Sequence, residues 1–171
     1  QEPVAAVMSV MRARNSDGIF VIYDIGGGTL DVALAESISG RVNLLANGGI
    51  AMCGGRDFDR LLVDNVVKPW LIENFDLPED VSTNPTFKPL LRLASWASER
   101  AKIELSARNE TVISLSETEA RVRDQGNNEV YIDIAVSREQ LDELVAEKID
   151  ESSKVVRETL SKAGLSPLDV Q

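Results

Sequence analysis

Residues 24–31 carry the side chains and glycines best suited to chemistry in this chain. They read DIGGGTLD, three consecutive glycines and a threonine with an aspartate at either end. Glycines let the backbone approach a bulky polyanion with its N–H groups, and the Thr29 hydroxyl can donate or accept a hydrogen bond. The carboxylates of Asp24 and Asp31 would repel a phosphate unless a cation lay between them, and Mg²⁺ is often held through carboxylates and phosphates. The segment therefore predicts a site for phosphate and Mg²⁺.

Two common phosphate-binding loops do not match this segment. A Walker-type P-loop needs a lysine and a serine or threonine after its glycines, followed by a helix, and a dinucleotide-binding glycine loop also opens a helix. Here the residues after the glycines alternate in polarity, which predicts a strand. A plain β-hairpin, whose glycines supply positive φ and whose aspartates face water, is the alternative that the spacing alone leaves open.

The apolar pattern around the glycine turn predicts an antiparallel meander. Residues 19–24 form an apolar run ending in an acid and predict a buried strand, residues 30–36 alternate, and residues 42–46 predict a third strand. Short turns join the three, so the glycine turn closes the first hairpin. Ahead of the meander, Pro3 opens a helix predicted over residues 3–14.

The middle of the chain predicts two helices. Glycine pairs at positions 48–49 and 54–55 indicate a change of architecture after the third strand. Helical spacing then predicts a helix over residues 57–75, with a kink before Pro69, and a second over residues 90–106. The buried side of the second helix is expected to consist of Leu90, Ala94, Ala97, Ala101 and Leu105.

The last third of the chain predicts strands followed by a long helix. The strands are expected over residues 111–115, 120–123 and 130–136. Ser137 and Gln140 form the capping-box pattern that opens a helix, Gly164 is typical of the residue that ends one, and Ser166 before a proline predicts a further start. The side chains expected to be buried along the long helix are Leu141, Leu144, Val145, Ile149, Val156, Leu160 and Ala163.

Composition excludes several classes of function. The chain has 171 residues and a net charge of −10, which argues against binding to nucleic acid or to an anionic membrane surface. It has no histidine, which excludes Ser–His and Cys–His nucleophiles and histidine-based metal sites. No apolar run is long enough to span a membrane. The single cysteine, Cys53, cannot form an internal disulfide and so does not fix the redox compartment, and we expect a cytoplasmic protein as the simpler interpretation.

Six ordered segments resemble the seventy-kilodalton heat-shock chaperone family. The run FVIYDIGGGTLDVALAE is similar to that family's second phosphate-binding hairpin, and QEPVAAVMSV to its helix opening before the hairpin. CGGRDFDRLL, SERAKIELS, SREQLDELV and AGLSPLDV follow in the family's order and spacing. The resemblance covers nearly the whole chain, and it is far more specific than one glycine turn.

The resemblance implies roles for the hairpin residues. Its phosphate and cation hairpin falls on Asp24, Gly26, Gly27, Gly28, Thr29 and Asp31. Glu2, Asp24 and Asp31 would hold Mg²⁺, mostly through water, and Thr29 would lie near the γ-phosphate and the attacking water. These four are the implied catalytic residues, and the implied cofactors are ATP or ADP, Mg²⁺ and, as a further option, K⁺.

The resemblance also places the adenosine on the predicted helix 90–106. Glu99, Lys102 and Ser106 fall on the family's adenosine-binding residues, and their i, i+3, i+7 spacing puts them on one helix face. A solvated face with a Glu–Lys pair is the alternative. Ile103 stands where many members have an arginine that stacks on adenine, and Arg56 replaces the usual acid after the second glycine pair.

The fold implied is α/β, lobe II of an actin-like ATPase with a ribonuclease-H-like core. Residues 1–52 and 147–171 would form an incomplete subdomain IIA, and residues 53–146 an inserted α+β subdomain IIB. The implied protein is a chaperone ATPase that binds and releases unfolded polypeptides, with a J-domain co-chaperone and a nucleotide-exchange factor gripping subdomain IIB. The stretch alone is expected to be inactive. A sugar kinase or an actin-like cytoskeletal ATPase is the alternative.

Overall fold

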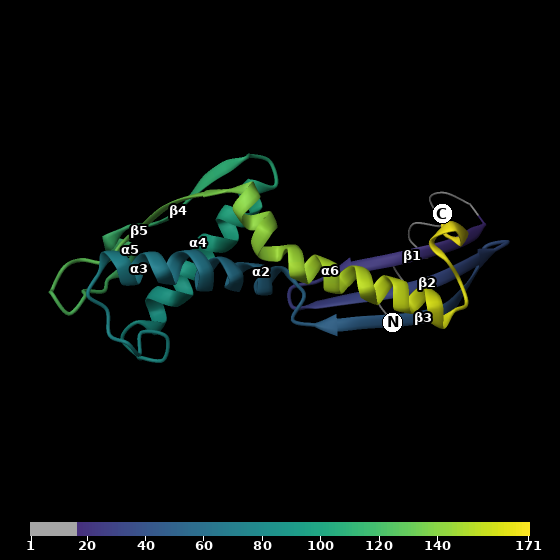
Figure 1. Ribbon diagram of the computed structural model, residues 1–171, viewed down its shortest axis with the longest axis horizontal. Coiled ribbons are helices and arrows are strands. Elements are labelled where there is room, and N and C mark those ends of the chain that lie inside the picture. The colour runs from purple at the N-terminus through teal and green to yellow at the C-terminus, as the bar shows by residue number, and fades with distance from the viewer. Residues whose placement is uncertain (1–16) are drawn as a thin grey trace. The chain divides into compact units, whose positions relative to one another are not determined.

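The computed structural model describes residues 17–171 (Figure 1). The helix predicted over residues 3–14, and Glu2 with it, lie outside the described residues. The chain forms two compact units. One combines Gln1–Gly55, described from residue 17, with Glu147–Gln171, and the other is Arg56–Ala146. In the described chain no helix is both long and apolar enough to cross a membrane.

The sheet of the first unit is the predicted antiparallel meander, in the order β1-β2-β3. Its strands are β1 (Gly18–Ile25), β2 (Thr29–Ile38) and β3 (Arg41–Ala51). The central strand β2 is buried on both faces over residues 32–35. The strand predicted over residues 19–24 is confirmed as β1, but the prediction that it is buried is wrong. Among the described residues β1 pairs only with β2, and it stays partly exposed along its length.

The glycine pair at 48–49 does not end the meander as predicted, because β3 continues through it to Ala51. The two glycines leave space on opposite faces of the sheet, because successive residues of a strand point to opposite sides. A Cβ on Gly48 would lie 2.5 Å from Thr159 Oγ1, and a Cβ on Gly49 would lie 2.7 Å from the Leu30 carbonyl oxygen. Both positions therefore exclude a side chain for a packing reason within a regular strand.

The helix α6 (Arg138–Lys162) enters the first unit at Glu147 and runs along the sheet (Figure 1). Its fully buried residues there are Ser152, Val155, Thr159 and Leu160. Of the seven apolar residues predicted to be buried on this helix, only Leu160 is fully buried, and Ile149 is 41% exposed. At Thr159 the helix approaches the sheet closely, because position 48 is glycine and carries no side chain. Gly164, at φ +70°, ends the helical segment as predicted.

The helices of the second unit follow the predicted pattern. A π-helical turn, Val63–Val67, links α2 (Gly55–Leu62) to α3 (Lys68–Asn74) and precedes Pro69, where a kink was expected. The second predicted helix is α4 (Lys88–Leu105). All five of its expected core residues are buried, and they pack in one core with the sheet of this unit.

The sheet of the second unit pairs β4 (Glu110–Leu115) with β5 (Ile132–Ser137). The strand predicted over residues 120–123 is wrong. Ser116 and Glu119 form a capping box that opens the short helix α5 (Glu117–Ala120), and Arg121 then takes a left-handed conformation at φ +51°. Local capping thus overrides the β-type sequence pattern, and only the bridge of Arg123 to Glu129 remains.

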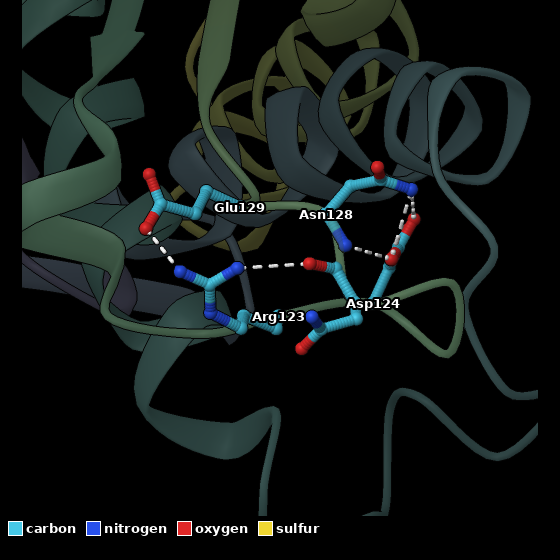
Figure 2. Close-up of polar contacts among 5 residues, drawn as sticks. Arg123, Asp124, Asn128 and Glu129 are labelled. Atoms are coloured by element: carbon cyan, nitrogen blue, oxygen red, sulfur yellow. Dashed lines mark hydrogen bonds and ion pairs between the residues drawn. The ribbon is translucent and has the colours of Figure 1, made fainter.

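The turn between these bridged residues is held by one buried carboxylate (Figure 2). Asp124 accepts hydrogen bonds from the backbone N–H of Asn128 at 2.7 Å and from its side-chain amide at 3.1 Å. It also accepts from the backbone N–H of Asp76 at 3.2 Å. The Asn128 side-chain bond is the main reason why the pKa of Asp124 is lowered. Figure 2 also shows the ion pair of Arg123 with Glu129.

Candidate functional site

The glycine turn joins β1 to β2 and is closed by its own backbone. The N–H of Gly26 donates to the carbonyl of Thr29 at 2.9 Å. Gly26, Gly27 and Thr29 are exposed, and Gly28 is half-buried. The turn therefore presents glycine backbone and the Thr29 hydroxyl at the surface of the first unit, as a phosphate-binding turn requires.

Asp24 and Asp31 lie directly opposite each other on β1 and β2. Directly opposed residues of an antiparallel pair share a face of the sheet, so both carboxylates project on the same side. The Thr29 hydroxyl lies 3.4 Å from the Asp31 carboxylate. Both aspartates are exposed. Opposed like charges are unfavourable on their own, and a cation between them removes that repulsion.

Gly49 lies opposite Asp31 on the third strand of the same face. A Cβ at Gly49 would lie 3.2 Å from Asp31 Oδ1, so glycine leaves room beside this carboxylate. The opposite face of the sheet is the one that α6 covers, where Val32 packs with Val155. The carboxylates of Asp24 and Asp31 therefore stand on the face that α6 leaves uncovered.

The segment after β3, residues 52–55, is hydrogen-bonded to the glycine turn. The N–H of Met52 donates to the Gly28 carbonyl at 2.9 Å, and the N–H of Gly55 donates to the Gly26 carbonyl at 3.0 Å. Between them, a Cβ on Gly54 would lie 2.4 Å from the Gly28 nitrogen. Gly54 is therefore required for this close approach of two backbone segments.

These residues fit a hydrated Mg²⁺ ion and a phosphate chain. Asp24 and Asp31 form a pair of opposed carboxylates. Within residues 17–171, no group of three or more acidic or cysteine side chains lies close enough together to hold a metal ion. Mg²⁺ characteristically keeps several waters and takes only one or two protein carboxylates. The predicted third acid, Glu2, lies outside the described residues.

The residues predicted to hold adenosine belong to the second unit, where Glu99, Lys102 and Ile103 lie on α4 and Ser106 is its C-cap residue. Glu99 and Ser106 are exposed, and Ile103 is 61% exposed. The Lys102 side chain is only 20% exposed, because its ammonium pairs with a buried acid. The predicted site residues thus fall into two groups, one on the hairpin of the first unit and one on α4.

The buried acid is Asp59 on α2, which sequence reasoning did not select. Its carboxylate is 5% exposed and lies 2.7 Å from the Lys102 ammonium. Burial raises the pKa of Asp59, while the hydrogen bond from Lys102 opposes that rise. The residue stands inside CGGRDFDRLL, so the signal in the sequence was the second acid of that segment, four residues after Gly55.

The family model described as "Hsp70 protein" matches residues 1–171. This chain belongs to the Hsp70 family. It is 33% identical over 169 residues to "Chaperone protein dnaK" of Cyanidioschyzon merolae, covering 99% of this chain and 26% of that protein. It is 31% and 32% identical over 170 residues to "Chaperone protein DnaK" of Thermosipho melanesiensis and Thermosipho africanus, covering 99% of this chain and 27% of each of those proteins.

Membership of the Hsp70 family confirms the predicted resemblance and the α/β, actin-like ATPase fold class. Nothing in these matches favours a sugar kinase or an actin-like cytoskeletal protein. The chain spans about a quarter of the length of the Hsp70-family relatives described above.

A second residue that sequence reasoning missed holds the end of α4 in this Hsp70-family chain. Arg138, at the start of α6, donates from its guanidinium to the carbonyls of Leu105 at 2.8 Å and Arg108 at 2.9 Å. Carbonyls at a helix C-terminus have no partner within the helix. Arg138 therefore caps the turn next to Ser106.

Proposed function

We propose that this chain provides the lobe II part of an ATP-binding domain, in a chaperone whose ATP hydrolysis controls the binding and release of unfolded polypeptides. The observation that carries the proposal is the exposed glycine turn with Asp24 and Asp31 opposed on one face, in a chain of the Hsp70 family. The relatives described above are named as chaperone proteins, which agrees with this proposal.

The hairpin residues would act on the phosphates. The backbone of residues 26–28 accommodates the phosphate chain, and Thr29 orients the attacking water near the γ-phosphate. Asp24, Asp31 and Glu2 hold the hydrated cation. Bound Mg²⁺ would neutralise the negative charge that develops during phosphoryl transfer, which is mainly a matter of positioning and electrostatics.

The α4 residues would act on the nucleoside. Glu99 can accept hydrogen bonds from ribose hydroxyls and Lys102 can donate to them, while Ser106 is both donor and acceptor. Ile103 replaces a cation–π contact by an apolar contact with the base, a loss of about 0.5–2 kcal/mol relative to arginine. ADP would bind at the same residues, and K⁺ is a further cation for the hairpin.

The partners proposed follow from the family. They are unfolded polypeptide clients, a J-domain co-chaperone, and a nucleotide-exchange factor that grips the unit Arg56–Ala146. This unit has its own apolar core, which supports its action as a separate gripping point. The cytoplasmic location stays a prediction.

The test of the proposed function compares hydrolysis with binding in the full-length protein. Asp24→Asn and Thr29→Ala should slow single-turnover ATP hydrolysis by about a hundredfold, because they act at the cation and the γ-phosphate in the transition state. ADP affinity, measured by calorimetry, should change by less than about tenfold. The matched control is Asp150→Asn at an exposed position of α6.

Equal losses in the rate of hydrolysis and in ADP affinity would show that the two residues bind the ground state and the transition state equally, with no specific effect on the transition state. A full-length protein that neither binds nor hydrolyses ATP in the presence of Mg²⁺ would refute the proposed function itself.

A further inference from the structure

Asp59 is a carboxylate in a place where carboxylates are seldom found. It lies on α2, is 4% exposed, and has the Lys102 ammonium of α4 at 2.7 Å. A charge this deeply buried is unfavourable unless it is paired and hydrogen-bonded. Replacing such a pair by apolar residues is often neutral or stabilising, so stability alone is a weak reason for it.

The two members of the pair differ in their exposure to solvent. Asp59 is buried, while the Lys102 side chain remains 20% exposed, so the ammonium lies between the interior and the surface. Glu99, one helical turn before Lys102 on α4, is exposed and close enough to raise the pKa of Asp59 by its charge. The buried acceptor Asp59 and the partly exposed Lys102 ammonium therefore form a pair, and the exposed acceptor Glu99 lies on the same face of α4 as Lys102.

A lysine side chain is otherwise the least directed of donors, because it is a point charge on a flexible stem. A buried acceptor removes that freedom by holding one N–H inward, which fixes the position of the nitrogen. Glu99 lies three residues before Lys102 on α4, and this spacing places its carboxylate, an acceptor, on the same helix face as the fixed donor. Two neighbouring hydroxyls match such a pair, because each can donate to one group and accept from the other.

We propose that Asp59 is a positioning residue that holds the Lys102 ammonium on the face of α4 that carries Glu99, and so sets the recognition of the ribose hydroxyls of the nucleotide. The inference rests on the proposed function, because it concerns the same nucleoside-binding residues. It adds a residue that itself touches no substrate and acts only through Lys102.

The test uses the full-length protein and measures Kd for ATP, 2′-deoxyATP and 3′-deoxyATP by calorimetry. The wild type should prefer ATP to at least one of the deoxynucleotides by about tenfold, the size of one hydrogen bond to a charged group. Asp59→Asn should raise the Kd for ATP by about tenfold and leave that deoxynucleotide nearly unchanged, so the preference falls to about one. A defect that is merely structural would weaken all three nucleotides equally.

Asp64→Asn is the matched control. Asp64 also pairs with a lysine, Lys68, at 2.6 Å, but its side chain is 42% exposed on the surface of the same unit. The same chemical change there should leave the preference for ATP intact, since surface ion pairs contribute little.

Lys102→Met keeps the test decisive if Asp59→Asn does not fold. It should abolish the same preference, and a folded double variant should lose no more than either single variant, because both act through one contact. Three results would each overturn the inference while leaving ATP binding established. The first is a preference for ATP that survives in Lys102→Met, and the second is an equal loss of affinity for all three nucleotides in Asp59→Asn. The third is a wild type that shows no preference for ATP over either deoxynucleotide. A wild type that binds no ATP would overturn the proposed function and the inference together.

Discussion

Gly54→Ala is the sharpest single test of how the glycine turn is supported. The added Cβ would lie 2.4 Å from the Gly28 nitrogen and 2.6 Å from the Gly26 carbonyl oxygen. Both neighbours are backbone atoms, and ordinary contact with a Cβ begins near 3.4 Å. The turn must therefore move by about 1 Å, because no flexible side chain can give way.

The expected cost combines two effects. Overpacking of this kind costs about 1–3 kcal/mol of the free energy of unfolding. The displacement also strains the bonds that the N–H groups of Met52 and Gly55 donate to the turn, each with a net contribution of about 0.5–1.5 kcal/mol. Because these effects overlap, we expect a total loss of about 1–3 kcal/mol. In the full-length protein, ATP hydrolysis should fall by about a hundredfold, since a 1 Å misplacement at a reacting centre has that effect.

Urea denaturation gives the loss of unfolding free energy, and amide hydrogen exchange at Met52 and Gly55 reports the two supporting bonds. The control is Gly26→Ala, whose added Cβ would have its nearest neighbours at 3.6 and 3.7 Å, both on Thr29. Its unfolding free energy should stay within about 0.5 kcal/mol of the wild type. If Gly54→Ala were as stable as Gly26→Ala, with unchanged exchange at both amides, the close-approach explanation would be refuted.

Three further predictions concern packing and pH. Gly48→Ala should lower the unfolding free energy by about 1–3 kcal/mol, because its Cβ would lie 2.5 Å from Thr159 Oγ1. Thr159→Ala should restore part of that loss in the double variant, and additive losses would contradict the contact. Ser98→Ala should leave thermal stability equal or higher, since its buried hydroxyl has no hydrogen-bond partner among the described residues. The pKa of Asp124 is lowered from its ordinary value of 3.8, so its ionised carboxylate stabilises the fold at pH values above 3.8. This contribution disappears as the pH falls through the lowered pKa. The thermal unfolding temperature of Asp124→Asn should therefore depend less on pH than that of the wild type below about pH 4.

Much of the fold was predictable because its signals are local. Alternating polarity specified the strands of the meander, and a capping box at Ser137 and Gln140 opens α6 as expected, with bonds of 2.9 and 3.1 Å. The five apolar positions of α4 lie in the core for the same reason, since helical spacing places them on one stripe. The candidate hairpin residues were chosen from composition and spacing within eight residues of chain.

The failures share a different cause. The strand predicted at 120–123 was wrong because a side-chain cap at Ser116 outweighed the β-type pattern. Gly48 resembled a breaker in the sequence, yet in the structure it admits Thr159 from a segment more than a hundred residues later. Ile149 was expected inside and is 41% exposed, whereas the polar residues Ser152 and Thr159 of the same helix are buried.

The sequence by itself determined the family, the glycine turn with its two aspartates, and the α4 face with Glu99 and Lys102. These features depend on residue types and on short spacings along the chain, both of which can be read directly from the sequence. Only the tertiary structure decided that Asp31 has room because position 49 is glycine, and that Lys102 is held by a buried acid 43 residues earlier. The physical reason is that periodicity reports which residues favour an apolar environment, whereas the partner of a buried charge depends on which two elements pack together.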